Sequence, residues 1–382
     1  MICVTLFWSL AVIFSGLTLM RYVLAIIEMQ KQNLEAPTAI SETEVTVLQP
    51  ILGGDPALEY CLKSNLSNAP KAHFIWLLDT DDKEGQKAAQ QALAASERKD
   101  VIVVVSPPPP AGSNPKTYKL SCGLQKTETI FVAVLDDDTV LPSGTLGRAA
   151  AWSVQGTLVT GLPTYEGHHN FGSCLVSGFV NANAILTYLP AAGMNLTQTI
   201  NGMFSLMRTE DIRKRGGFNA FLEEVTDDYA LAQLFLSQTG RIKQTSLHLS
   251  ITTTVDNIRH YFALMRRWMV FAKLYLRENI SLGIFALVLL PGILPLPLVF
   301  AGIAAGGFTT LVAFFLLGMK ALLTGDLAQR LHVESSPLSD LIFQIIAELL
   351  LPLHMITASL RPHHIRWRKR SFVLKGRKIV DG

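Results

Sequence analysis

The sequence has little charge and few cysteines for its length. Only 16% of its 382 residues are Asp, Glu, Lys or Arg, against 49% hydrophobic residues, a balance too apolar for an ordinary soluble enzyme. The net charge is +3, and the middle of the chain lacks the basic face that nucleic-acid binding needs. Its four cysteines are scattered without a Cys-x-x-Cys spacing, which argues against a disulfide framework and a cysteine metal cluster. We therefore expect a membrane-associated protein with no nucleic-acid partner and a globular part in a reducing compartment.

Apolar residues gather at the two ends of the chain. Residues 4–28 form an apolar stretch that contains Arg21 and is long enough to cross a bilayer. A cleaved signal peptide is the alternative, but no clear small-residue cleavage site follows. We therefore predict an N-terminal transmembrane anchor over residues 1–30.

The pattern returns to that of a membrane protein after residue 255. Residues 256–279 combine aromatic and apolar side chains with five Lys or Arg residues, which predicts an amphipathic helix at the bilayer surface. Residues 280–360 contain three apolar stretches and form the predicted transmembrane or interfacial region. Residues 361–382 carry eight Lys or Arg residues against one Asp, and we expect them to form a basic cytosolic tail.

The excess of Lys and Arg also bears on topology. A catalytic domain and a basic tail that both face the cytosol need an even number of crossings between them. We therefore expect residues 280–322 to form a two-span hairpin and residues 339–359 to lie in the interface or re-enter. The prediction is a multi-pass integral membrane protein whose catalytic domain is cytosolic.

Residues 44–255 have the pattern of an α/β domain. Apolar runs alternate with helical stretches such as 84–99, which predicts a largely parallel, Rossmann-like sheet with its ligands at the carboxyl ends of the strands. The runs that we interpret as strands are 45–48, 74–78, 101–105, 130–135 and 157–162.

Three consecutive aspartates end the strand 130–135. Carboxylates this close repel one another, by roughly a kcal/mol or more per pair, unless a cation lies among them. Oxygen ligands two residues apart can converge on one hard ion, so Asp136 and Asp138 are candidate metal ligands. Asp137 points the other way on an extended strand and is expected to be structural. From the triplet alone, a solvated acidic turn is an equal alternative.

Four further polar motifs belong with these aspartates. They are Leu77–Asp82 at another strand end, Asn114–Lys116 after a proline-rich loop, Thr226–Tyr229, and Arg266–Trp268 on the amphipathic helix. Acidic strand ends, a metal-type Asp-x-Asp, a later carboxylate and an Arg-Trp pair together suit the handling of a diphosphate leaving group.

In this order, the motifs resemble those of glycosyltransferases of families 2 and 21, and are most similar to the ceramide glucosyltransferases. The resemblance covers residues 44–275 and the membrane layout. It implies an α/β GT-A (nucleotide-diphospho-sugar transferase) domain with N- and C-terminal transmembrane helices. The closest local matches are Asn114–Lys116, Gly161–Pro163, Asn201–Arg208, Thr226–Tyr229 and Ile365–Arg370.

The resemblance also implies roles for the donor-side residues. Asp79 should contact the uracil or ribose of a UDP-sugar, and a strand-end carboxylate suits that contact. Asp136 and Asp138 should hold Mg²⁺ or Mn²⁺, which bridges the diphosphate; Asp136 thereby also belongs to the substrate site. Lys116 should reach the phosphates, with an ordinary solvated lysine as the alternative.

On the acceptor side, Asp228 resembles the catalytic base that takes the proton of the attacking hydroxyl. Its neighbour Asp227 should push one pKa of the pair upward, although either carboxylate could instead cap the following helix. Arg267 should bind the pyrophosphate and Trp268 should line the acceptor site, with interfacial anchoring as the alternative. Leu264 stands where the family usually has Gln or Arg.

The expected function is an inverting transfer of a sugar, glucose by resemblance, from a UDP-sugar to the hydroxyl of a ceramide-like membrane lipid. One alternative changes the substrates, to N-acetylglucosamine or another sugar and a hopanoid or glycerolipid. Another is a polysaccharide synthase, which needs more spanning helices. The non-enzymatic alternative is a membrane-anchored binding protein with a degenerate transferase domain. His168 and His169 resemble a loop near the sugar or acceptor, without a third ligand for a metal.

Overall fold

The computed structural model describes residues 1–165, 170–333, 338–360, 364–367 and 370–381. The chain divides into two compact units. One, the helical unit, contains Met1–Leu34, Gly167–Leu196 and Val255–Pro362, and the other, the α/β unit, contains Glu35–Glu166, Thr197–Thr254 and His363–Gly382. The segment from Gly167 to Leu196, which we expected within one continuous catalytic domain, therefore groups with the apolar helices.

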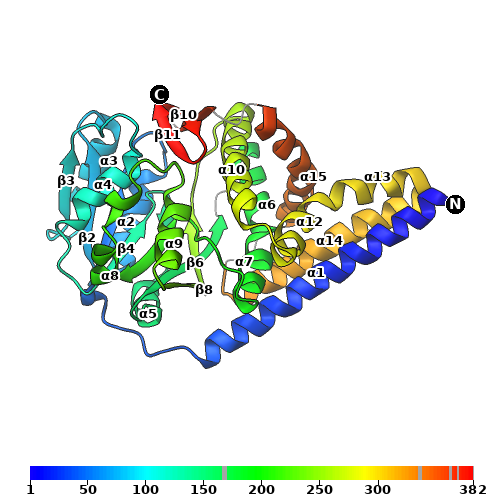
Figure 1. Ribbon diagram of the computed structural model, residues 1–382, viewed down its shortest axis with the longest axis horizontal. Helices are drawn as coiled ribbons and strands as arrows, with labels where there is room; N and C mark the ends of the chain where they lie inside the picture. The colour runs from blue at the N-terminus through cyan, green and yellow to red at the C-terminus, as the bar shows by residue number, and fades with distance from the viewer. Residues whose placement is uncertain (166–169, 334–337, 361–363, 368–369, 382) are drawn as a thin grey trace. The chain divides into compact units, whose positions relative to one another are not determined.

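The α/β unit is built on an eight-stranded sheet in the order β3-β2-β1-β4-β7-β6-β8-β5 (Figure 1). Its strands are β1 (Val45–Pro50), β2 (His73–Asp79), β3 (Ile102–Ser106), β4 (Phe131–Leu135), β5 (Thr139–Val140), β6 (Thr157–Tyr165), β7 (Phe204–Arg208) and β8 (Arg241–Ile251). The five expected strands are confirmed. The sheet is mixed rather than largely parallel, because β7 runs antiparallel to both β4 and β6, and β5 antiparallel to β8.

Helices cover both faces of this sheet. Alternate residues of β2 show this: Trp76 belongs to the core on one face and Ile75 and Leu77 to the core on the other. Because both faces are buried, the strands read as continuous apolar runs. The helices are α2 (Leu58–Asn68), α3 (Lys83–Ala94), α4 (Pro115–Leu124), α5 (Thr145–Trp152), α8 (Thr209–Lys214) and α9 (Asp227–Ser237), with short 3₁₀ turns at Glu42–Glu44 and Phe218–Phe221.

The C-terminal segment, expected as a basic tail, forms a small antiparallel sheet that belongs to the α/β unit. Its strands are β9 (His364–Trp367), β10 (Arg370–Lys375) and β11 (Lys378–Asp381). Gly376, with φ of 65°, occupies the first position of the two-residue turn between β10 and β11. This conformation is the one for which a tight hairpin turn selects glycine.

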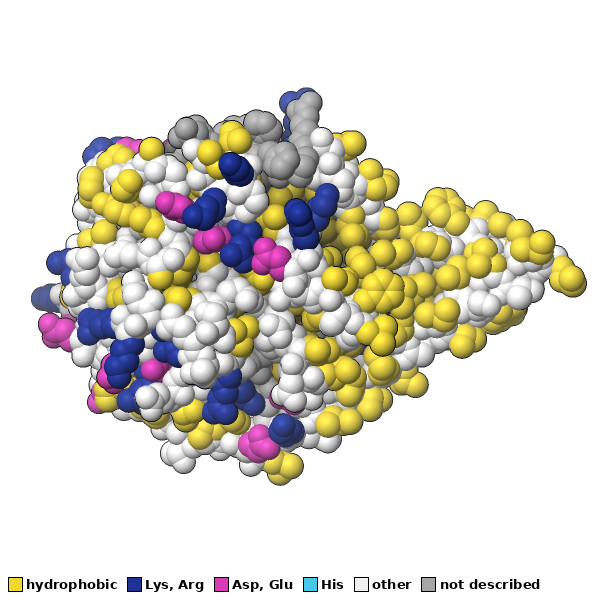
Figure 2. All heavy atoms as spheres, in the orientation of Figure 1, with side chains coloured by type: hydrophobic (Ala, Val, Ile, Leu, Met, Phe, Trp, Pro, Cys, Tyr) yellow, Lys and Arg dark blue, Asp and Glu magenta, His cyan; other side chains and the backbone are white. Residues whose placement is uncertain are grey.

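The helical unit consists of long apolar helices and shorter connecting ones. They are α1 (Ile2–Leu34), α6 (Phe171–Asn181), α7 (Ala184–Gly193), α10 (Ile258–Asn279), α11 (Leu282–Ile284), the π-helix Phe285–Leu289, α12 (Leu290–Ile293), α13 (Pro295–Ala305), α14 (Gly307–Arg330) and α15 (Leu338–Leu360). Helices α1, α13 and α14 run side by side around a core that includes Phe7, Leu298 and Leu317 (Figure 1). Their outer surfaces carry a nearly continuous cover of hydrophobic side chains (Figure 2).

Four helical segments are long and apolar enough to cross a bilayer: Ile2–Leu34, Phe171–Gly193, Gly307–Arg330 and Asp340–Leu360. A fifth candidate is the pair Leu282–Ile293 and Pro295–Ala305, which is bent by 47°. The chain is therefore a membrane protein. The first span of the hairpin expected over residues 280–322 is broken near Pro291 and Pro295, where the missing N–H groups interrupt the helical hydrogen bonds. The topology expected from charge stays a prediction.

Candidate active site

The three aspartates at the end of β4 take different directions. The backbone N–H of Asp136 donates to Met203 O at 2.9 Å, so this residue continues the β4–β7 pairing. The buried Asp137 accepts the Leu52 N–H at 2.8 Å, as expected for a structural residue. Asp138 accepts the Thr253 hydroxyl at 2.8 Å and is thereby fixed from the end of β8. The triplet is an anchored turn rather than a solvated one.

Lys116 lies between two of the acidic motifs. Its Nζ is 2.6 Å from Asp136 Oδ1 and 2.9 Å from Asp227 Oδ2, and it donates to Gly202 O at 3.1 Å. Asn114 caps α4 by accepting the N–H of Lys116 and orients the first turn of that helix. Lys116 therefore ties the end of β4 to the start of α9. The alternative interpretation, that Lys116 is an ordinary solvated lysine, is therefore wrong.

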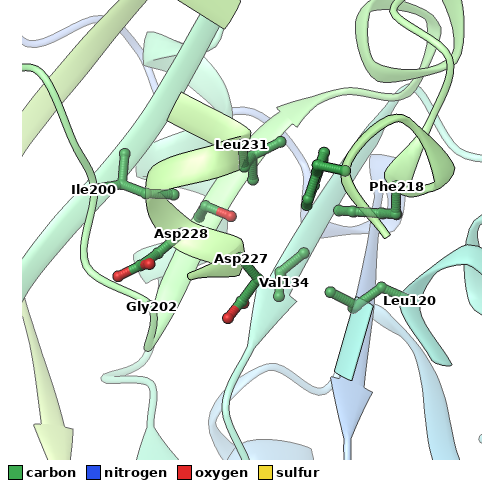
Figure 3. Close-up of a pocket in the computed structure, with 10 residues that line it drawn as sticks. Leu120, Val134, Ile200, Gly202, Phe218, Asp227, Asp228 and Leu231 are labelled. Atoms are coloured by element: carbon green, nitrogen blue, oxygen red, sulfur yellow. The ribbon is translucent and has the colours of Figure 1, made fainter. Parts of the chain in front are cut away.

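Asp227 and Asp228 begin α9, where the helix dipole favours negative charge. Thr226 occupies the N-cap position, so neither carboxylate has the capping role considered from the sequence. Asp228 Oδ1 accepts the Tyr229 N–H at 2.7 Å. Both carboxylates line a pocket whose apolar wall includes Leu120 and Phe218, and they point to different sides from the helix start (Figure 3).

The pKa values of two aspartates in this cluster are raised, by burial and by neighbouring carboxylates. Burial raises the pKa of Asp136 to about 7, with Asp138 and Asp227 adding to the effect and Lys116 opposing it. Burial, reinforced by Asp227, raises the pKa of Asp228 to about 6. Burial lowers the pKa of Lys116, but Asp136 and Asp227 outweigh it and the pKa is raised, so Lys116 stays charged.

Asp79 ends β2 in a buried position, with 2% of its surface exposed. Lys119 donates to its Oδ2 at 3.2 Å and also to Ile51 O at 2.8 Å. Its Oδ1 is buried without a hydrogen-bond partner in the structure. An unsatisfied buried acceptor is costly, so this oxygen is suited to a donor group from a ligand.

The donor set of the aspartates fits a hard divalent cation. Asp136 and Asp138 offer oxygen ligands, and the Lys116 ammonium contacts both Asp136 and Asp227 while Asp138 adds a further carboxylate near Asp136, so the carboxylates outnumber the ammonium. Within the described residues no group of three or more His, Cys, Asp or Glu side chains is arranged to hold a metal. One or two carboxylates with the remaining positions left to phosphates and water is the arrangement that Mg²⁺ prefers at nucleotide sites.

Arg267 and Trp268 lie on α10 in the helical unit. The Trp268 ring packs against Phe179 of α6, with 6.1 Å between ring centroids. Leu264 is 7% exposed and follows Tyr261 by three residues on the buried stripe of the helix, so it has a packing position. His168 and His169 lie outside the described residues.

Sequence reasoning missed two cations of the α/β unit. Lys119, the partner of Asp79, lies three residues after Lys116 on the same helical turn, a spacing that would have paired it with the site. Arg377 contacts the segment before α9 from the C-terminal hairpin. Only the tertiary structure brings these positions together.

Comparisons with known proteins agree with this architecture. The model of glycosyl transferase family 21 matches residues 7–380. The mannosyltransferase PcManGT from Pyrobaculum calidifontis, solved in complex with GDP-Man and Mn²⁺, has a similar structure, with a TM-score of 0.50, 15% identity and coverage of 96% of this chain and 99% of its own. GalNAc-T7, solved with UDP, GalNAc and Mn²⁺, has a TM-score of 0.42 and 9% identity over 60% of this chain and 48% of its own. A comparison with curated protein sequences gives no match.

The mixed α/β sheet, joined to helices apolar enough to cross a bilayer, has the GT-A fold, and with the family match the chain is a membrane glycosyltransferase. The chain belongs to glycosyl transferase family 21, which confirms the resemblance seen in its motifs.

Proposed function

We propose that this glycosyltransferase moves a sugar, with inversion, from a UDP-sugar to the hydroxyl of a membrane lipid, with glucose and ceramide as the donor sugar and acceptor. The observation that carries the proposal is the link Asp136–Lys116–Asp227 beside Asp228, which joins a candidate metal and phosphate site to a candidate base. The identity of both substrates rests on the motifs shared with the ceramide glucosyltransferases.

Asp228 acts as the catalytic base. A carboxylate with a pKa of about 6 is mostly ionised at neutral pH and still basic enough to take a proton from the attacking hydroxyl. The Tyr229 N–H occupies Oδ1, and Gly202 leaves room beside Oδ2, since a Cβ there would lie 3.5 Å from this oxygen. Oδ2 is therefore the oxygen that receives the proton.

The donor side uses the other strand ends. Asp136 and Asp138 would hold Mg²⁺ or Mn²⁺, which when bound would supply positive charge to neutralise the diphosphate leaving group. Lys116 holds Asp136 in position and supplies a positive charge beside the phosphates. Asp79 accepts a hydrogen bond from the uracil or ribose through its unsatisfied Oδ1.

The acceptor is assigned to the membrane side. Arg267 contributes a guanidinium for the pyrophosphate, and Trp268 contributes an aromatic surface for the lipid. Both lie on α10, whose aromatic and basic composition suits the bilayer surface, where a lipid head group is available while its tails stay in the membrane.

The test is sugar transfer by the purified protein in lipid micelles. UDP-glucose, ceramide and Mn²⁺ or Mg²⁺ should give UDP and glucosylceramide, identified by mass, and EDTA should abolish the reaction. UDP-N-acetylglucosamine, diacylglycerol and a hopanoid serve as alternative substrates in the same assay. Another lipid product would replace the proposed substrates, a polymer would favour a polysaccharide synthase, and no UDP release with any pair would favour a binding protein.

A further inference from the structure

The segment immediately before the catalytic pair has its pairing partners in the C-terminal hairpin. Val225 N–H donates to Arg377 O at 2.8 Å, and Ile379 N–H donates to Glu223 O at 2.9 Å. Glu224 and Lys378 form an antiparallel bridge between these two bonds. Residues 223–225 thus extend the small C-terminal sheet by a further strand-like segment, directly before Asp227.

One side chain of the hairpin contacts both flanks of the catalytic pair. Arg377 Nε is 3.2 Å from Glu224 Oε2, three residues before Asp227. The Arg377 guanidinium also lies over the ring of Tyr229, 5.4 Å from its centroid, and Tyr229 directly follows Asp228. The Glu224 side chain is 15% exposed and Tyr229 is 5% exposed, while the Arg377 side chain is 31% exposed, so both contacts are partly shielded from water.

The opposite side of the same segment is held by α4. The Asn114 side-chain amide donates to Glu224 O at 3.0 Å and to Val225 O at 3.3 Å, and Asn114 N–H donates to Leu222 O at 2.7 Å. The segment therefore lies between Asn114, which also caps the helix of Lys116, and the hairpin. Its position determines where α9 starts.

We propose that Arg377, at the tip of the β10–β11 hairpin, is a positioning residue, which holds the carboxylates of Asp227 and Asp228 in place through its contacts with Glu224 and Tyr229. Gly376 sets the tight turn that presents Arg377 at the hairpin tip. The proposal rests on the proposed role of Asp228. It does not give Arg377 any contact with substrate.

The test compares Arg377→Ala, Arg377→Lys and Lys378→Ala in transfer from UDP-glucose to ceramide. We expect R377A to lower kcat by about 10- to 100-fold, because a small displacement of a catalytic group is costly, with little change in the KM for UDP-glucose. R377K should recover part of the rate, since it keeps a cation beside Glu224 and Tyr229. K378A removes only the exposed pair with Glu223 and is the matched control with normal kcat.

Two further measurements keep the test decisive. Glu224→Gln removes the ion pair without changing the hairpin and should lower kcat in the same direction even if R377A folds poorly. Hydrogen exchange of residues 222–230, measured without substrates, should be faster in R377A than in K378A, and it gives a result even if the wild-type protein transfers no sugar to ceramide. Normal kcat in both R377A and E224Q, an effect on KM alone, or equal losses in R377A and K378A would overturn the proposal.

Discussion

Two lysines, Lys116 in the α/β unit and Lys320 in the helical unit, differ in the number of carboxylates that surround them. Lys116 contacts the carboxylates of both Asp136 and Asp227, and Asp138 adds a third negative charge nearby. Lys320 of α14 is 2% exposed and pairs with one carboxylate, that of Glu348, and with the Asn183 amide at 3.3 Å.

The difference separates a site from a packing contact. In the α/β unit the carboxylates outnumber the ammonium group, and the Asp136 side chain is 32% exposed, so the cluster is accessible to a cation from solvent, as the proposed metal site requires. In the helical unit one ammonium and one carboxylate satisfy each other, and their contact joins α14 to α15. Charge balance, rather than burial, distinguishes the two clusters.

The largest effect is expected at Asp228. Asp228→Asn keeps the shape and the Tyr229 contact but cannot take a proton, so kcat should fall about 10²- to 10⁴-fold without loss of folding. The measurement is the initial rate of UDP release with UDP-glucose and ceramide. Glu210→Gln, at an exposed pair with Lys214, is the control and should keep normal activity. Full turnover by D228N would remove Asp228 as the base.

Breaking the balanced cluster should affect stability instead. Glu348→Ala leaves Lys320 buried without its carboxylate, which should destabilise the protein by about 3 kcal/mol. The measurement is Tm in detergent, and the double variant Lys320→Leu with Glu348→Leu should recover much of the loss because neither charge of the pair remains buried. An unchanged Tm in E348A would show that this pair does not hold the helices together.

The corresponding change in the acidic cluster should lower Tm less than E348A does, because Asp136 is 32% exposed and solvent can reach it, and it should lower activity. Lys116→Met removes the cation that holds Asp136, so kcat/KM for the donor and the apparent metal affinity should fall about 10- to 100-fold. A Mn²⁺ titration of UDP release measures both quantities. If K116M lowered Tm as far as E348A does, the proposed contrast between the two clusters would be wrong.

The smallest effect is the pH dependence of the base. Burial and Asp227 raise the pKa of Asp228 to about 6, and only the ionised form accepts a proton. Activity should therefore fall as the pH drops through 6, by about tenfold between pH 7 and pH 5 for this single group. Rate profiles of kcat measure it, and the residual activity of D228N should lack this acid limb.

The sequence predicted the parts of the fold that local patterns encode. The strands β1, β2, β4 and β6 are buried on both faces, so they appear as apolar runs, and the more exposed edge strand β3 keeps an apolar run of its own. Strand β8 escaped notice because polar side chains are spread along Arg241–Ile251 and its burial follows no regular alternation, so no apolar run marks it. The apolar segment Phe171–Gly193 was hidden by Asn181 and Asn183, which interrupt it between α6 and α7.

The candidate site shows the same division. Asp136 and Asp138 were visible because close carboxylates repel one another unless a cation lies among them, and Lys116 because Asn114–Lys116 resembles a motif of the family. The direction of each carboxylate depends on distant partners such as Thr253 and Leu52, which no local pattern reveals. Arg377 looked like one more charge in a basic tail because its partner Glu224 lies far away in the sequence.

The pairing of residues 223–225 with the hairpin has a consequence for biosynthesis. Because Arg377 and Ile379 follow α14 and α15 in the chain, the ribosome makes the partners of this segment only after it has made those apolar helices. A nascent chain thus carries Asp228 through the synthesis of all the following helices without the contacts that border it in the finished protein. The last contacts of the catalytic loop form only after the preceding helices have been synthesised.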